Sequence, residues 1–141
     1  EGKHEGPRRL RQMALDKSAD VEELGKRILA AAMRVHSALG PGLLEGADET
    51  CLANDPAPLG MRVEGQMTLL LEYEGQRIEA GYRLDLLVEG LVVVEAKAVE
   101  KLMPIHLAQV VTYLRLGKYP LGYLLNFNVL HMRQGIKRIV V

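Results

Sequence analysis

The sequence lacks the features that mark secreted and membrane proteins. Its 141 residues include one cysteine, Cys51, so an internal disulfide framework is excluded. A single cysteine is typical of a reducing compartment, and we expect the protein to be cytoplasmic. No stretch approaches the ~18 consecutive apolar residues of a membrane span, and residues 1–20 lack the apolar stretch of a secretory signal. We therefore predict no membrane association.

Net charge is also absent. The 18 Lys and Arg residues equal the 18 Asp and Glu residues, which argues against a broad basic surface that coats nucleic acid but leaves room for a local basic cleft. Neither a Cys and His cluster for zinc nor a glycine-rich phosphate loop is present. What the chain does contain is 48% hydrophobic residues, enough for one globular core.

The first part of the chain predicts a leader and two helices. Residues 1–19 mix Gly, Pro and both charge signs without a sustained period, so we predict a flexible leader followed by one domain over residues 20–141. From Asp20, apolar residues recur every three or four positions, which predicts an amphipathic helix that ends at Gly40-Pro41-Gly42. A second, short helix is expected from about Leu43 to Ala53.

The second part predicts a sheet with one crossover helix. Apolar residues alternate with a period of two, and a helical period returns only after Pro104, where it ends at Gly117. The expected strands cover residues 61–66, 67–73, 77–88, 91–98, 121–127 and 136–141. The order α-α-β-β-β-β-α-β-β predicts a mixed central sheet flanked by helices, in the α/β or α+β class.

Three charged residues lie where the strands should be apolar. Asp85 sits within residues 81–88, and Glu95 and Lys97 end the apolar stretch that begins at Leu91. Burying an unpaired carboxylate costs several kcal/mol, so such residues are normally excluded unless they are paired or bind a cation. Two carboxylates suit Mg²⁺ or Mn²⁺, and the ammonium can orient an attacking water. The alternative is an ordinary ion pair at the ends of two strands.

The hairpin loop decides between these readings. A two-residue loop at Glu89-Gly90 would send Asp85 and Glu95 to opposite faces of the sheet. A three-residue loop, Val88-Glu89-Gly90, places Asp85 opposite Val93 and on the same face as Glu95. We predict the odd loop or an equivalent bulge.

Other polar residues admit two interpretations each. His106, one turn before Gln109, is either a phosphate contact or a helix cap. Cys51 is expected to be a small buried side chain. Several basic residues would either line a phosphate-binding groove or lie on a solvated strand edge: Lys101, Arg115, Lys118, Arg133, Lys137 and Arg138.

Five short motifs in order resemble the GxxExxY family, a branch of the PD-(D/E)XK nuclease superfamily. They are Gly42-Leu-Leu-Glu45, Gly81-Tyr-Arg-Leu-Asp85, Glu95-Ala-Lys97, Pro104-Ile-His-Leu-Ala-Gln109 and Asn126-Phe-Asn128. The resemblance covers about residues 20–141 and implies a restriction-endonuclease-like core of a helix, a three-stranded meander, a helix and a further strand.

The resemblance also implies roles. Asp85 and Glu95 would be metal ligands, Lys97 the catalytic lysine and Glu45 the additional acidic residue. Gln109 and Tyr113 look like the Q-x-x-x-Y motif of RecB-type relatives, and their spacing places both on one helical face; a solvated glutamine and a core tyrosine are the alternatives. The chain departs from the family at Asp48, which replaces the motif's tyrosine and would either join the metal shell or repel it.

The function that these observations predict is hydrolysis of DNA with Mg²⁺ or Mn²⁺. Residues 136–141 form an apolar edge through which two copies could pair as a homodimer. Two alternatives stay open: a catalytically silent module that binds nucleic acid or protein, and a toxin or defence component with an unidentified partner protein.

Overall fold

The computed structural model describes residues 5–42, 45–54 and 61–141, with the side chains of residues 5, 12–19, 45 and 79–82 left out. The elements in chain order are α1 (Glu5–Leu39), α2 (Glu45–Ala53), β1 (Val63–Tyr73), β2 (Gln76–Val88), β3 (Val92–Lys97), α3 (Pro104–Gly117), β4 (Leu121–Asn126), the 3-10 turn η1 (Met132–Gly135) and β5 (Ile136–Ile139).

The strands form one mixed sheet of five strands in the order β1-β2-β3-β4-β5. β3 and β4 run parallel, and the other neighbouring pairs run antiparallel. A parallel pair needs a crossover connection, and α3 provides it. The predicted fold class, a mixed sheet flanked by helices, is therefore confirmed.

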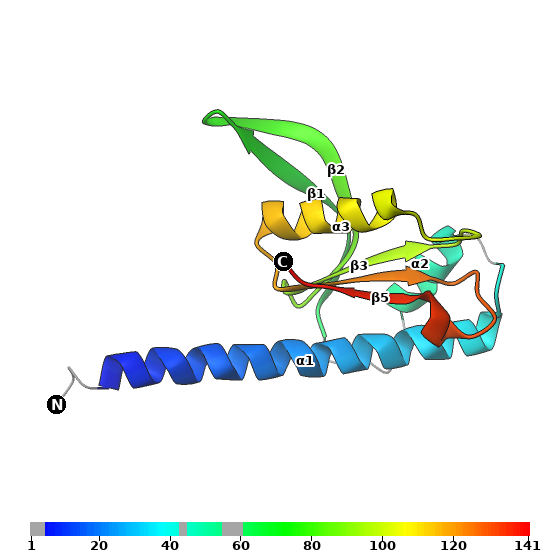
Figure 1. Ribbon diagram of the computed structural model, residues 1–141, viewed down its shortest axis with the longest axis horizontal. Helices are drawn as coiled ribbons and strands as arrows, with labels where there is room; N and C mark the ends of the chain where they lie inside the picture. Colours follow the sequence, from blue (N-terminus) through cyan, green and yellow to red (C-terminus); the bar gives the residue numbers. More distant parts are fainter. Residues whose placement is uncertain (1–4, 43–44, 55–60) are drawn as a thin grey trace.

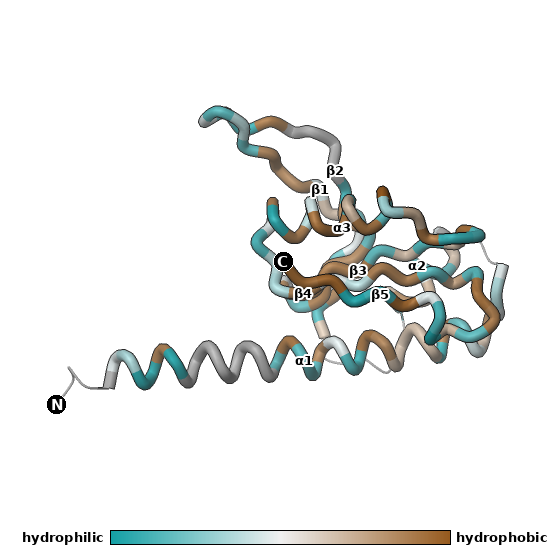
Figure 2. Tube along the Cα trace, in the orientation of Figure 1, coloured by the Kyte–Doolittle hydropathy of each residue, from teal (hydrophilic) through white to brown (hydrophobic). Residues whose placement is uncertain are grey.

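Helices cover both faces of the sheet (Figure 1). One buried cluster joins α1 and α2 to the sheet residues Leu86, Val94 and Ala96. The second cluster lies on the α3 side and contains Leu87, Val93 and Tyr113. Apolar residues follow the central strands in Figure 2, whereas the N-terminal part of α1 extends past the sheet. The central strands are thus covered on both sides, which explains why a charge within them is costly.

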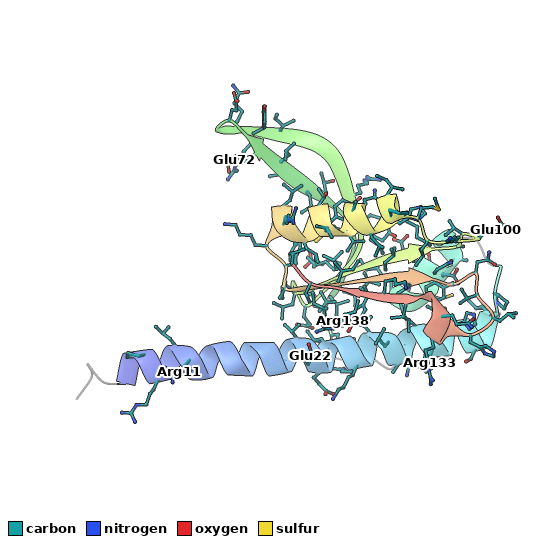
Figure 3. The ribbon with its side chains drawn as sticks, in the orientation of Figure 1. Arg11, Glu22, Glu72, Glu100, Arg133 and Arg138 are labelled. Carbon is teal, nitrogen blue, oxygen red and sulfur yellow. The ribbon has the colours of Figure 1, made fainter. Side chains whose placement is uncertain are left out.

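Helix α1 presents the predicted apolar face to the sheet. The buried positions on it are Val21, Leu24, Ile28, Ala31, Ala32 and Val35. The helix begins at Glu5 and not at Asp20, so residues 5–19, expected to be a leader without regular structure, continue it. An ion pair between Glu22 of α1 and Arg138 of β5 ties the helix to the sheet edge (Figure 3).

Two boundaries differ from the sequence pattern. The segments 61–66 and 67–73, expected to be separate strands, form the single strand β1. Its pairing with β2 is interrupted at Gln66, which has a positive φ of 54°, and the register shifts between Leu69 and Leu71, but the strand continues through both places. The second helix is confirmed from Glu45 onward, and the predicted start at Leu43 lies outside the described residues.

In the part of the chain that the structure describes, we find no helix with both the length and the hydropathy required to cross a membrane.

Candidate active site

The register of the β2–β3 hairpin brings the two carboxylates together. Val88 pairs with Val92 and Leu86 with Val94, so the loop has three residues, as predicted. Its members are Glu89-Gly90-Leu91 instead of Val88-Glu89-Gly90, because Glu89 and Gly90 both take left-handed φ values of 53° and 65°. Asp85 is therefore next to Glu95 and not opposite Val93.

Beyond Leu86 and Val94, hydrogen bonds from the backbone to side chains replace the backbone pairing of β2 with β3. The last backbone pair is Leu86 with Val94, and one residue further Asp85 N donates to Glu95 Oε1 at 2.9 Å. In return, Ala96 N donates to Asp85 Oδ2 at 3.1 Å. Each carboxylate thus satisfies an amide of the opposite strand that would otherwise lack a partner. Two carboxylate oxygens thus lie where the backbone pairing of β2 and β3 ends.

Burial makes this pair of acids hard to ionise. Glu95 is 3% exposed. Its burial, followed by the charge of Asp85, raises the pKa of Glu95 to about 8. Burial also raises the pKa of Asp85, against the hydrogen bond from Ala96 and the charge of Lys97. A carboxyl that holds its proton to this pH has an unusual environment, which is frequent at functional sites.

Lys97 belongs to the same cluster. Its charge lowers the pKa of both Asp85 and Glu95, so the ammonium lies near the two acids. Val93 packs on the α3 side, and side chains alternate along a strand, so Glu95 and Lys97 are directed to that side too. The structure therefore brings together the three charged residues that the sequence singled out.

Asn126, the first residue of the motif Asn126-Phe-Asn128, is a further polar residue of this region, and the sequence did not predict a role for it. It pairs with Lys97 across the parallel strands and is 3% exposed. Its side chain accepts from Val99 N at 3.1 Å and donates to Val99 O at 2.9 Å. Asn126 thereby holds the segment that follows Lys97. The signal for it was available: a polar residue within the apolar run 121–127.

The predicted residues of α3 have different surroundings. Tyr113 is 3% exposed and packs in the α3-side cluster, whereas Gln109 is exposed. His106 accepts a hydrogen bond from Met103 N through Nδ1 at 2.9 Å, and so caps the helix. The capping interpretation of His106 is therefore met. The structure gives Tyr113 a core position over the same face of the sheet as Glu95.

The remaining predicted residues lie away from the carboxylate pair or have side chains that the structure does not describe. Lys101, Arg115 and Lys118 are exposed, at the start and at the end of α3. The Glu45 backbone belongs to α2, and its side chain lies outside the described residues. Cys51 is exposed, so the expectation that it is buried was wrong, because it occupies the outer face of α2.

A second buried acid, Asp48 of α2, is separate from this site. It is 0% exposed, and neither of its oxygens has a hydrogen-bond partner among the described residues. Burial raises the pKa of Asp48, and the nearby charge of His36 lowers it in part. Helix α2 packs in the buried cluster with α1, whereas Glu95 is directed to the α3 side of the sheet. Asp48 therefore interacts with α1 and not with the carboxylate pair.

We expect Asp48→Asn to stabilise the protein by about 1 to 3 kcal/mol at neutral pH, because the amide removes a buried charge that lacks donors. The folded state holds the Asp48 proton more tightly than the unfolded state, so stability falls as pH rises above about 3.8. The advantage of the variant should vanish at lower pH. Urea unfolding at several pH values measures this, with the exposed Asp20→Asn as control; a less stable variant at neutral pH contradicts it.

The carboxylate pair fits a divalent metal ion. Carboxylate oxygens are the donors that Mg²⁺ and Mn²⁺ prefer, and a cation would offset the repulsion that raises the pKa of Glu95. Among the described side chains, which exclude that of Glu45, no group of three His, Cys, Asp or Glu could hold a metal. Asp85 and Glu95 would thus supply two ligands, and water, substrate or Glu45 the others.

The geometry defines a mixed-sheet domain with two acids and a lysine where the pairing of its central strands β2 and β3 ends. Residues 22–139 match the family model of the PD-(D/E)XK nuclease superfamily, and the chain belongs to this superfamily. Nucleases of this superfamily generally use divalent metals. No curated protein and no solved structure matches the chain.

Proposed function

We propose that the protein is a metal-dependent nuclease that hydrolyses phosphodiester bonds of DNA, and that it belongs to the GxxExxY branch of its superfamily. The observation that carries this proposal is the contact between Asp85 and the buried Glu95 beside Lys97, where the pairing of β2 with β3 ends. Structural ion pairs rarely place two acids in hydrogen-bond contact, because the second acid adds repulsion and no attraction.

Each residue has a role in this proposal. Asp85 and Glu95, with Glu45, hold Mg²⁺ or Mn²⁺, which supplies Lewis acidity to the phosphate and a more acidic bound water. Lys97 orients the attacking water and offsets the negative charge that develops on the phosphoryl oxygens. Gln109 and Tyr113 complete the site from α3. Lys101, Arg115 and Lys118 contact the phosphate backbone on either side, and His106, whose Nδ1 caps α3, contacts it through its other ring nitrogen.

The same proposal includes the setting of the protein. The edge strand β5 pairs only with β4, and Val140 and Val141 after it are exposed, which suits a homodimer formed edge to edge. A cytoplasmic location agrees with the single cysteine, which is exposed and would need a reducing environment to stay free.

The test of the function is cleavage of plasmid and single-stranded DNA with Mg²⁺, Mn²⁺ or EDTA. We expect cleavage that depends on the metal, and a loss of at least about 10²-fold in Asp85→Asn, because the variant removes a ligand charge. Glu100→Gln, which changes an exposed acid in the segment after β3, is the matched control and should keep full activity.

The outcomes separate the alternatives. Equal cleavage by wild type and Asp85→Asn would indicate a contaminating nuclease. DNA binding without cleavage under either metal would favour the silent binding module. Neither binding nor cleavage would leave the partner-protein alternative.

A further inference from the structure

An open groove of about 780 Å³ lies on the opposite side of the sheet from α3. One wall is the C-terminal end of α1, with Met33 and Ser37, and Pro41 just after it. The other wall is the segment from Leu130 to Gln134, which contains most of η1. Figure 3 shows Arg133 beside the C-terminal half of α1. We name this hollow the α1–η1 groove.

The groove is lined in part by apolar residues, such as Met33, Leu130 and Met132, and in part by hydrogen-bond donors. Ser37, His131, Arg133 and Gln134 all carry side-chain O–H or N–H groups, and no carboxylate is found among its described lining residues. This composition is unusual in a chain with as many acids as bases. It favours an anionic occupant.

A second groove of the molecule provides the contrast. It has about 310 Å³, lies between α1 and the β2–β3 loop, and carries the acids Asp20, Glu23 and Glu89 against the single base Arg27 among its described lining residues. The two hollows flank the same helix with opposite charge. By its charge, the α1–η1 groove therefore suits a polyanion, whereas the groove beside the β2–β3 loop repels one.

The basic wall of the α1–η1 groove is built onto the strand that pairs with Lys97. Asn126 is the β4 partner of Lys97, and a Cβ at Gly135 would lie 2.0 Å from Asn126 O, so only glycine lets η1 approach the strand end this closely. His36 Nε2 donates to Val129 O at 2.7 Å and fastens the same segment to α1. The wall is therefore held in place on both sides.

We infer that the α1–η1 groove binds the phosphate backbone of the nucleic acid that the site cleaves, an inference that rests on the proposed function. Arg133 and His131 contact phosphate oxygens, and Gln134 and Ser37 add neutral donors. The exposed side chains of Leu130 and Met33 meet the sugars. No Phe, Tyr or Trp is among the described lining residues, so stacking of bases on such rings does not contribute to binding in this groove.

The experiment measures binding without cleavage. The full chain is titrated in EDTA into fluorescein-labelled single- and double-stranded DNA, and anisotropy is recorded from about 50 to 300 mM salt. We expect Arg133→Ala to weaken binding about fivefold to tenfold at low salt and to reduce the salt slope by about 1, with Arg133→Glu weaker still. Arg77→Ala, an exposed arginine of the β1–β2 hairpin, is the control and should bind as wild type.

A second measurement separates binding from chemistry. In single-turnover cleavage, Arg133→Ala should raise the DNA concentration needed for half-maximal rate and leave the saturated rate unchanged. If Arg133→Ala and Arg133→Glu bind DNA as tightly as wild type while wild type cleaves it, the inference is wrong and the proposed function stands. If wild type neither binds nor cleaves DNA, both fail. Circular dichroism confirms that the exposed substitutions leave the fold intact.

Discussion

Glu95→Gln should stabilise the metal-free protein by on the order of 3 kcal/mol at pH 8 and above. The carboxyl of Glu95 is buried beside Asp85, and its pKa is raised from 4.5 to about 8. Between these values the folded protein retains a proton that the unfolded chain releases, so stability declines as pH rises. The stabilising contribution is complete below pH 4.5 and lost once pH exceeds about 8. Glutamine does not ionise and avoids this decline.

The Glu95→Gln variant also keeps the local hydrogen bonds, which makes the comparison clean. The amide oxygen of the glutamine can accept from Asp85 N as Glu95 Oε1 does, and the amide N–H can donate to the carboxylate of Asp85. Urea unfolding in EDTA from about pH 4 to pH 9 measures the difference, and Glu100→Gln is the exposed control. Mn²⁺ should stabilise wild type more than the variant. A variant that is less stable at every pH would show that the folded state tolerates the charge.

Lys97→Met should lower the saturated single-turnover rate of DNA cleavage by about 10²- to 10⁴-fold. The ammonium lies near both acids and, in the proposed mechanism, offsets charge that develops on the phosphoryl oxygens. Methionine retains most of the side-chain volume and removes only the charge. Lys97→Arg tests geometry separately, because a planar guanidinium cannot take the position of a compact ammonium without displacing its neighbours.

Metal affinity distinguishes this effect from loss of the metal site. Without the ammonium, Asp85 and Glu95 should bind Mn²⁺ at least as tightly as in wild type, since a repelling positive charge is gone. Isothermal titration with Mn²⁺ measures the affinity, and Lys26→Met on the exposed side of α1 is the matched control for charge removal. An unchanged cleavage rate in Lys97→Met would remove the lysine from the mechanism.

The chemistry of the site was predictable because it violates a local pattern. Apolar runs on both sides of Asp85 and Glu95 predict burial, and burial makes a charge costly whatever the fold. The odd number of residues in the β2–β3 loop was also predictable, since only an odd number places both acids on one face of the sheet. The exact loop residues were not predictable. The glycine at position 90 indicates one left-handed residue, but nothing in the sequence indicates that Glu89 is left-handed as well.

Positions set by packing were harder. Cys51 precedes the apolar Leu52 yet is exposed, and Asp48 is charged yet is fully buried, because the orientation of a helix of nine residues depends on what α1 and the sheet leave uncovered. The amphipathic face of α2 is too weak to define this orientation. The role of His106 depended likewise on where the backbone of Met103 turns into α3.

Sequence alone determined the fold class, the inward face of α1 and the three charged residues of the central strands, since each follows from spacing along the chain. Tertiary structure alone decided what those residues meet. The contact of Asp85 with Glu95, the isolation of Asp48 and the donor-lined groove beside η1 all join segments distant in sequence. Such contacts depend on strand register and on packing, and neither can be recognised from the periodicity of the sequence.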